Sequence, residues 1–174
     1  MTPYPSGRKR HGNLSGENPP KPGTYKILGD VLHHPMFDCG VVGRNEGCPD
    51  EWMREKKTIR EHLDYKFIMA LEGNDVASNL KWVMSSNSLA VMTRPTCETW
   101  FMEGTLVAGY HYVEVKEDFS DLPEKLQYYI EHPEQAEDII RHAHEYVRQF
   151  QDKERENLIS LMVLDKYFRL SGQQ

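Results

Sequence analysis

Residues 65–92 read YKFIMALEGNDVASNLKWVMSSNSLAVM, and this stretch decides the fold. After Lys66, apolar residues continue without alternation to Leu71, and a second apolar run covers 89–92. Unbroken runs of this kind are typical of strands that are buried on both faces of a parallel sheet. Between the two runs, apolar residues recur at helical spacing: Val76, Leu80, Val83 and Met84. The stretch therefore predicts a strand–helix–strand unit.

Downstream of this unit the same alternation continues. One or two helical turns are predicted at 98–103 and a third strand at 110–115. Three helices follow, at 121–132, from Pro133 to about Phe150, and at 153–170. The last helix is expected to bury a set of apolar side chains: Leu158, Leu161, Met162, Leu164 and Tyr167. We therefore predict an α/β fold with a Rossmann-like parallel sheet and flanking helices.

Upstream, the composition changes. Residues 1–23 are rich in Gly, Pro and basic side chains and predict a flexible basic arm. A short helix is expected at 24–34 and a short strand at 37–42, and the Thr58-Ile-Arg-Glu61 pattern predicts a capping box that starts a further helix. The predicted organisation is therefore the arm followed by one domain over residues 24–174.

Charge and composition exclude several classes. The chain of 174 residues carries a formal net charge of −6, which argues against nucleic-acid binding because that function needs a basic surface. Neither a run of about 18 apolar residues nor a signal peptide is present, so no transmembrane segment is expected. Three cysteines without CxxC spacing, together with eight histidines that share no helix face, predict neither a disulfide scaffold nor a metal site.

The turn after the first buried strand is the strongest candidate for chemistry. It reads EGNDVASN over residues 72–79 and opens a helix, where free backbone N–H groups and the helix dipole favour a phosphate. Gly73 allows a close approach of the backbone, and three side chains can add donors: Ser78, Asn79 and Lys81. The alternative is that Asp75 only caps the helix and Gly73 only forms the turn. The pattern is neither GxGxxG nor a P-loop.

Other polar residues near the strand ends allow two interpretations each. Glu98 can accept ribose hydroxyls, or it is simply a favourable charge at a helix start. His111 enters the third strand beside a ligand loop, although a structural hydrogen bond is the preferred explanation for it. Asp118 and Asp121 can serve as base and acid, or they cap the following helix. No nucleophile–histidine–carboxylate triad can be assigned from the spacing.

At this point the motifs resemble glycosyltransferase family 90. The similarity lies in YKFIMALEGNDVASNLKW (65–82), SSNS (85–88), ETWF (98–101), HYVEV (111–115) and DFSDL (118–122), in that order. The family includes bacterial lipopolysaccharide glycosyltransferases, capsule-associated xylosyltransferases and protein O-glucosyltransferases. The EGND-VASNLKW form is most similar to the bacterial lipopolysaccharide branch.

The resemblance covers roughly residues 35–173 and implies the C-terminal, donor-binding half of a GT-B glycosyltransferase. It implies metal-independent, inverting transfer from a UDP-sugar. The turn and helix at 73–81, including Asn74 and Asp75, would then face the donor diphosphate. Glu98 would hold the ribose. His111, Asp118 and Asp121 would line the cleft between the halves.

Two departures from the family pattern matter. Animal relatives carry an arginine near the position of Asn79, and Lys81 is the cation that this chain offers two residues later. In the family, the aspartate that deprotonates the acceptor lies in the N-terminal half, which this sequence does not contain. No catalytic residue is therefore assigned, and whether the chain is an enzyme by itself stays open.

The sequence supports one function and one alternative. The first is the donor-binding half of a truncated or split glycosyltransferase of lipopolysaccharide or surface-glycan biosynthesis. Its partners would be a UDP-sugar, a glycan acceptor such as the lipopolysaccharide core, and a missing N-terminal half. It would need no cofactor and would be cytoplasmic, with peripheral attachment to the inner membrane as a variant. The alternative is a non-catalytic remnant or interaction domain that retains the fold.

Overall fold

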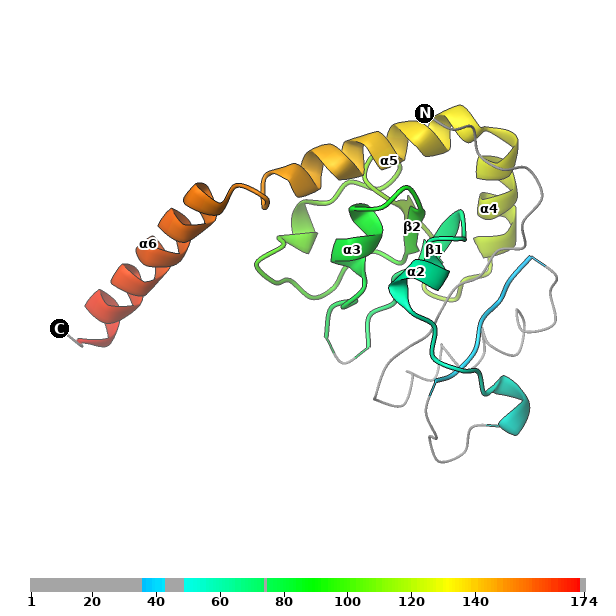
Figure 1. Cartoon of the computed structure of the whole chain (residues 1–174), viewed down its shortest axis with the longest axis horizontal. Coiled ribbons are helices and arrows are strands. Elements are labelled where there is room, and N and C mark those ends of the chain that lie inside the picture. Colours follow the sequence, from blue (N-terminus) through cyan, green and yellow to red (C-terminus); the bar gives the residue numbers. More distant parts are fainter. Residues whose placement is uncertain (1–35, 43–48, 74, 173–174) are drawn as a thin grey trace.

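The computed structural model describes residues 36–42, 49–73 and 75–172. The predicted basic arm and the predicted helix at 24–34 lie outside the described residues. After a 3₁₀ turn and a short helix, the described chain continues as strand–helix–strand, a second 3₁₀ turn, a third strand and three helices (Figure 1). This confirms the predicted α/β class.

Three parallel strands form the sheet. Strands β1 (Phe67–Met69), β2 (Leu89–Met92) and β3 (Val113–Glu114) lie in the order β1-β2-β3, with Phe67 opposite Leu89 and Val91 opposite Val113. All residues of β1 and β2 are buried, as expected from their unbroken apolar runs. Because the strands are parallel, their carboxyl ends meet at one edge of the sheet.

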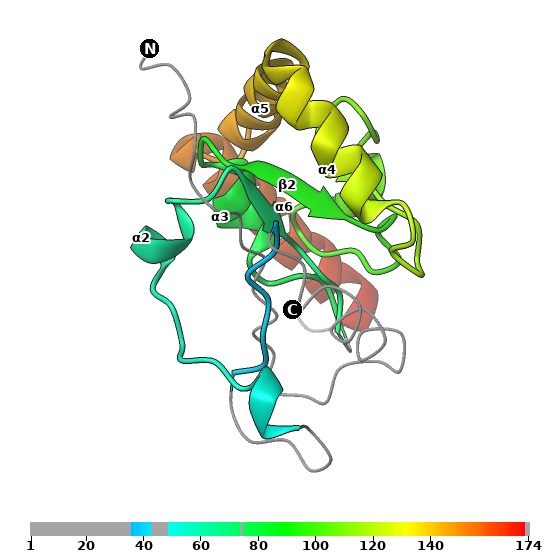
Figure 2. The ribbon, with the colours of Figure 1, turned by 90° about the vertical axis from the view of Figure 1, so that its right-hand side faces the viewer.

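Successive side chains along each strand point to opposite faces of the sheet, and each face contributes to its own hydrophobic core. One core contains Phe67, Met69 and Val91, and it packs against α4 (Leu122–Glu131) and the first half of α5 (Pro133–Arg148). The other contains Ile68, and it packs against α3 (Leu80–Met84) and the second half of α5. Figure 2 shows α4 and α5 beside the strands. Helix α5 therefore contributes to both cores.

The helix starts follow the sequence signals. Helix α2 (Ile59–His62) begins at a complete capping box, in which Glu61 N–H donates to the Thr58 hydroxyl and Thr58 N–H donates to the Glu61 carboxylate. Both α4 and α5 carry a proline in the first turn, where its missing N–H has no helical partner to lose. A short 3₁₀ turn, η1, covers Asp50–Trp52.

Three local predictions were wrong. Residues 98–102 are not helical; a 3₁₀ turn, η2, begins at the end of the predicted segment and covers Glu103–Thr105. Helix α3 has five residues, because residues 75–79 form bends and turns before it. The predicted strand at 37–42 is reduced to a single bridge between Val41 and Met53.

The largest difference concerns the last helix, α6 (Lys153–Ser171). Its bounds match the prediction, but it has no buried residue. The expected burial of five side chains was therefore wrong: Leu158, Leu161, Met162, Leu164 and Tyr167 are all exposed. Figure 1 shows the reason, since α6 extends away from the sheet beyond the end of α5. Within the described ranges, no helix has the length and apolar character needed to cross a bilayer.

Candidate functional site

Glu72 ties together the loops that follow β1 and β2. Its carboxylate accepts hydrogen bonds from the Thr96 N–H at 3.0 Å, the Thr96 hydroxyl at 2.5 Å and the Cys97 N–H at 3.1 Å. These bonds hold the first residues of both loops at the carboxyl edge of the sheet, where open α/β sheets bind ligands. Sequence reasoning included Glu72 in the candidate segment 72–79 but assigned its side chain no role. A carboxylate directly after a buried strand was the available signal.

The turn between Gly73 and α3 presents unpaired donors. The Asn79 carboxamide donates to the Met69 carbonyl at 2.9 Å and so fixes the turn against the end of β1. Within the described residues, the N–H groups of Ala77, Ser78 and Asn79 have no acceptor. A side chain at Gly73 would meet no atom within 4 Å, so the backbone there is open.

Asp75 shapes this turn rather than capping α3. Its carbonyl accepts from the Gly73 N–H at 3.1 Å, and its carboxylate accepts from the Val76 N–H at 2.8 Å. Asn79 is the residue before α3 and makes no capping bond with its side chain. Asn74 lies outside the described residues. The predicted role of these residues in donor binding stays a prediction.

Lys81 is engaged inside the protein. Its ammonium donates to Glu103 Oε1 at 2.7 Å, and Glu103 is only 1% exposed. The Thr99 N–H and hydroxyl also donate to this carboxylate, at 2.7 and 2.9 Å. Burial alone would raise the pKa of Glu103, but the Lys81 and Thr99 hydrogen bonds together lower it below its ordinary value. Glu103 is a second residue that the sequence did not reveal.

Glu98 lies close to this buried ion pair. Its carboxylate oxygen sits 3.2 Å from the position that a side-chain carbon at Gly104 would take, so Gly104 makes room for it. Burial raises the pKa of Tyr146, and the charges of Glu103 and Glu98 add to that shift. The Glu98 side chain is otherwise exposed. Since 98–103 is not helical, its alternative role at a helix start was wrong, and its ribose-binding role stays a prediction.

His111 accepts a structural hydrogen bond. The Val107 N–H donates to its Nδ1 at 2.9 Å, which places the proton of the neutral ring on Nε2. Burial lowers the pKa of His111, and the nearby His142 adds to this shift. His111 precedes β3, so it lies at the opposite end of that strand from Asp118.

Asp118 and Asp121 follow β3 and organise the turn into α4. The Asp118 carboxylate accepts from the Ser120 N–H at 3.1 Å, while Asp121 accepts from the Lys116 N–H at 2.9 Å. Asp121 also pairs with Lys125 at 3.4 Å. They therefore lie at the same edge of the sheet as Glu72, and their predicted place in the cleft remains to be tested.

One cation at this edge was overlooked in the sequence. Arg94 directly follows β2, its side chain is exposed, and it makes no ion pair within the described residues. The positive charge of Arg94 interacts electrostatically with the buried Tyr112. The Tyr112 hydroxyl donates a hydrogen bond to Glu114 at 2.8 Å. The position of Arg94 after a buried strand was the signal that could have found it. Arg94 and the donors at 77–79 therefore belong to neighbouring loops of one edge.

The remaining features lie elsewhere. A cavity of about 380 Å³ opens between α2 and the loop after α3, and is lined by Ile59, Leu63, Trp82 and residues 85–88. It lies next to the amino end of β2. The SSNS motif is structural here, since Ser88 donates to the Tyr65 carbonyl and Ser86 to the Val83 carbonyl. In the described part of the chain, no three His, Cys, Asp or Glu side chains gather in a way that could hold a metal ion.

The fold is similar to that of a solved protein domain. It is similar to the crystal structure of the C-terminal domain of the glycosyl transferase group 1 family protein LpcC from Francisella tularensis, with a TM-score of 0.52 and 13% identity. The likeness covers 82% of this chain and 86% of that one. At this identity the likeness shows the fold alone: an α/β domain that resembles the C-terminal half of a GT-B glycosyltransferase.

Sequence comparison defines the family. The model of glycosyl transferase family 90 matches residues 44–171, so the chain belongs to this family. A curated relative, the O-glucosyltransferase LpsA of Dichelobacter nodosus, is 46% identical over 150 residues, which is 86% of this chain. The chain spans only 46% of that relative's length. The predicted resemblance is therefore confirmed.

Proposed function

We propose that the chain binds a sugar nucleotide at the carboxyl edge of its sheet and acts in glycosyl transfer as the donor-binding half. The observation that carries this proposal is the row of three N–H groups at Ala77, Ser78 and Asn79, without acceptors in the described chain, beside the open backbone of Gly73. Consecutive backbone N–H groups that lack internal acceptors can form a cradle for phosphate oxygens. The diphosphate of the donor would accept these bonds.

The surroundings hold this cradle in place before any ligand arrives. Asn79 anchors the turn to the end of β1, and Glu72 anchors the neighbouring loop through three hydrogen bonds. A site that is ordered in advance loses less conformational entropy when it binds. Family membership supports the assignment of a sugar nucleotide rather than another phosphate ligand.

In this proposal, Arg94 supplies the positive charge that pairs with the donor diphosphate. Lys81 was the cation that the sequence offered, but its ammonium is bonded to the buried Glu103. Removing Lys81 from that pair would leave a carboxylate unpaired in the interior, which is costly. Arg94 is exposed at the adjacent loop, and its planar guanidinium suits bidentate contact with a phosphate. Glu98 remains the proposed ribose ligand.

The finer details of the proposed reaction are drawn from the relatives of this chain. The printed name of the Dichelobacter nodosus relative supports glucose as the transferred sugar, and the family resemblance supports a UDP-linked donor, inversion and a lipopolysaccharide acceptor. An inverting transfer needs a base on the acceptor side. That base is proposed to come from the region that corresponds to the part of the relative outside the match, and the reaction is proposed to take place at the cytoplasmic side of the inner membrane without a metal.

Titration calorimetry of the chain with UDP-glucose and UDP tests the site. We expect Ser78→Glu to weaken binding at least tenfold, because the new carboxylate would repel the diphosphate. The matched neutral variant Ser78→Gln should weaken it much less. Arg94→Gln should also weaken binding, while Arg148→Gln at the exposed end of α5 should leave it unchanged.

Two results would contradict the proposal. The first is that neither UDP nor UDP-glucose binds at millimolar concentration, which favours the alternative of a non-catalytic domain. The second is equal affinity for the wild-type chain and Ser78→Glu, which would move the ligand away from the turn. Circular dichroism of each variant checks that the fold is intact.

A further inference from the structure

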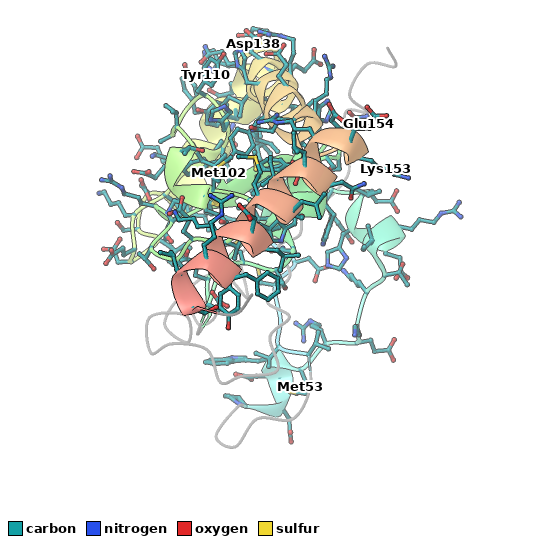
Figure 3. All side chains as sticks on the ribbon, turned by 90° about the vertical axis from the view of Figure 1, so that its left-hand side faces the viewer. Met53, Met102, Tyr110, Asp138, Lys153 and Glu154 are labelled. Carbon is teal, nitrogen blue, oxygen red and sulfur yellow. The ribbon has the colours of Figure 1, made fainter. Side chains whose placement is uncertain are left out.

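A second concave surface lies away from the candidate donor site. It is the cavity of about 380 Å³ between α2 and the loop after α3, and it is lined by Ile59, Leu63, Trp82 and residues 85–88. The turn at 73–79 precedes α3 and the loop of the cavity follows it, so the two lie at opposite ends of that helix. Figure 3 shows α2 on the other side of the molecule from Met102 and Tyr110, which belong to the segment after Glu98. The cavity is therefore separate from the site at the carboxyl edge of the sheet.

The lining of this cavity combines apolar and hydrogen-bonding groups without charge. An indole ring and two aliphatic side chains form its apolar part, while the serines and the asparagine of residues 85–88 supply hydroxyls and a carboxamide. None of the described residues that line the cavity is charged. An anionic ligand would find no counter-charge there. A neutral ligand that carries both C–H surface and hydroxyls would find partners for each.

The polar groups of the loop keep free capacity for a ligand. The Ser85 and Ser86 hydroxyls each donate to a carbonyl of α3 at 2.7 Å. A hydroxyl that donates its proton in this way can still accept a hydrogen bond. The Asn87 carboxamide is exposed and makes no hydrogen bond with the described residues, so it offers two donors and one acceptor.

Contacts from two helices hold the walls of the cavity in place. From α5, the Nε2–H of His144 donates to the Ser86 carbonyl at 2.8 Å. From α2, the Nδ1–H of His62 donates to the Thr58 carbonyl at 2.7 Å. The His62 ring also meets the Trp82 ring in a T-shaped contact, with the ring centroids 5.7 Å apart. The aromatic wall and the polar loop are therefore ordered in advance, which lowers the entropy that binding costs.

We propose that this cavity binds a neutral saccharide unit at a place separate from the sugar nucleotide. The C–H groups of a sugar ring lie against Trp82 and the aliphatic side chains of α2, and its hydroxyls bond to Asn87 and the serines. Membership of glycosyl transferase family 90 supports a saccharide as the neutral polyhydroxyl ligand of this chain. The inference goes beyond the proposed function and does not require donor binding at 73–79. A free sugar and a unit of a glycan chain offer the same chemistry, and the experiment separates them.

Nuclear magnetic resonance of the full, ¹⁵N-labelled chain tests the cavity. The three tryptophans give three indole N–H signals, and the signal that is lost in Trp82→Phe belongs to the cavity. We expect this signal to shift saturably with at least one of glucose, galactose, mannose and N-acetylglucosamine at millimolar concentration. Tighter binding of the matching linear trisaccharide would assign the cavity to a glycan chain, and equal binding would assign it to a single sugar.

A matched pair of variants separates a bound sugar from a nonspecific effect. Asn87→Ala should weaken sugar binding at least fivefold, because it removes the free carboxamide. Asn157→Ala makes the same change at an exposed position of α6 and should leave sugar binding unchanged. UDP should shift the backbone amides of 77–79 and leave the Trp82 indole signal in place. Failure of the cavity and failure of the donor site therefore appear in different signals.

Four results would overturn the inference. The first is a Trp82 indole signal that none of these sugars shifts, and the second is equal sugar affinity of the wild-type chain and Asn87→Ala. The third is a larger shift of this signal with UDP than with any sugar. The fourth is a shift that follows the concentration of the chain alone, which would assign the cavity to a contact between two copies.

Discussion

The strands of the sheet and helix α6 are similar in apolar character and opposite in environment. Residues of β1 and β2 are at most 4% exposed, whereas the large apolar residues of α6 are at least 41% exposed. The strands are covered on both faces by helices of the same chain, whereas none of the described elements buries a residue of α6. Apolar character thus reports that a segment will be buried, and says nothing about which polypeptide buries it.

The largest expected effect comes from breaking the internal core. Leu80 is 1% exposed and packs between α3 and the sheet. Leu80→Ala removes buried methyl groups and leaves a cavity, and we expect it to lower the free energy of unfolding by about 3 kcal/mol. Chemical denaturation followed by circular dichroism measures this. A loss below about 1 kcal/mol would mean that the core around α3 is loosely packed.

A smaller effect on the free energy of unfolding is expected from breaking the buried ion pair between Lys81 and Glu103. Glu103→Gln keeps the shape but leaves the Lys81 ammonium without its carboxylate, and we expect it to cost about 2 kcal/mol. This is below the usual cost of breaking a buried pair because the Lys81 side chain is 23% exposed and regains some hydration. Glu98→Gln, at an exposed carboxylate nearby, should change stability by less than about 0.5 kcal/mol.

The same pair predicts a pH dependence. The pKa of Glu103 is lower in the folded chain than its ordinary value of 4.5, so the unfolded chain binds a proton more readily. Its contribution is fully present above that ordinary value and is lost as the pH falls through the lower pKa of the folded state. Denaturation curves at neutral and acidic pH should show a smaller acid-induced loss for Glu103→Gln than for the wild-type chain.

The sequence was informative where one short segment decides the structure. The unbroken runs at 67–69 and 89–92 identified two buried strands, and the capping box at Thr58 identified the start of α2. The helix expected at 98–103 failed because Glu103 turns inward to meet Lys81, a contact between residues 22 positions apart. Such contacts depend on the tertiary fold and leave no periodic signal.

The candidate site was only partly visible for the same reason. Gly73, Ser78 and Asn79 follow a strand directly, and the structure does place this turn at the carboxyl edge of the sheet. Glu72 reaches a loop 24 residues away, and this bond could not be found from spacing. The burial of α6 was predicted from its apolar pattern, and it is physically correct that such a pattern favours burial. The error was to assume that the covering surface lies in the described part of the same chain.

The smallest expected effect sharpens the comparison most. Leu161→Ala removes the same atoms as Leu80→Ala, but from a side chain that is 63% exposed. In the chain alone we expect it to change the free energy of unfolding by less than about 0.5 kcal/mol, because no packed contact is lost and alanine favours the helix. Denaturation of both variants under the same conditions gives the contrast directly. A loss close to that of Leu80→Ala would show that Leu161 is already buried in solution, and α6 would then pack on the body or on another copy. A negligible loss would show that the apolar surface of α6 is exposed in the chain alone.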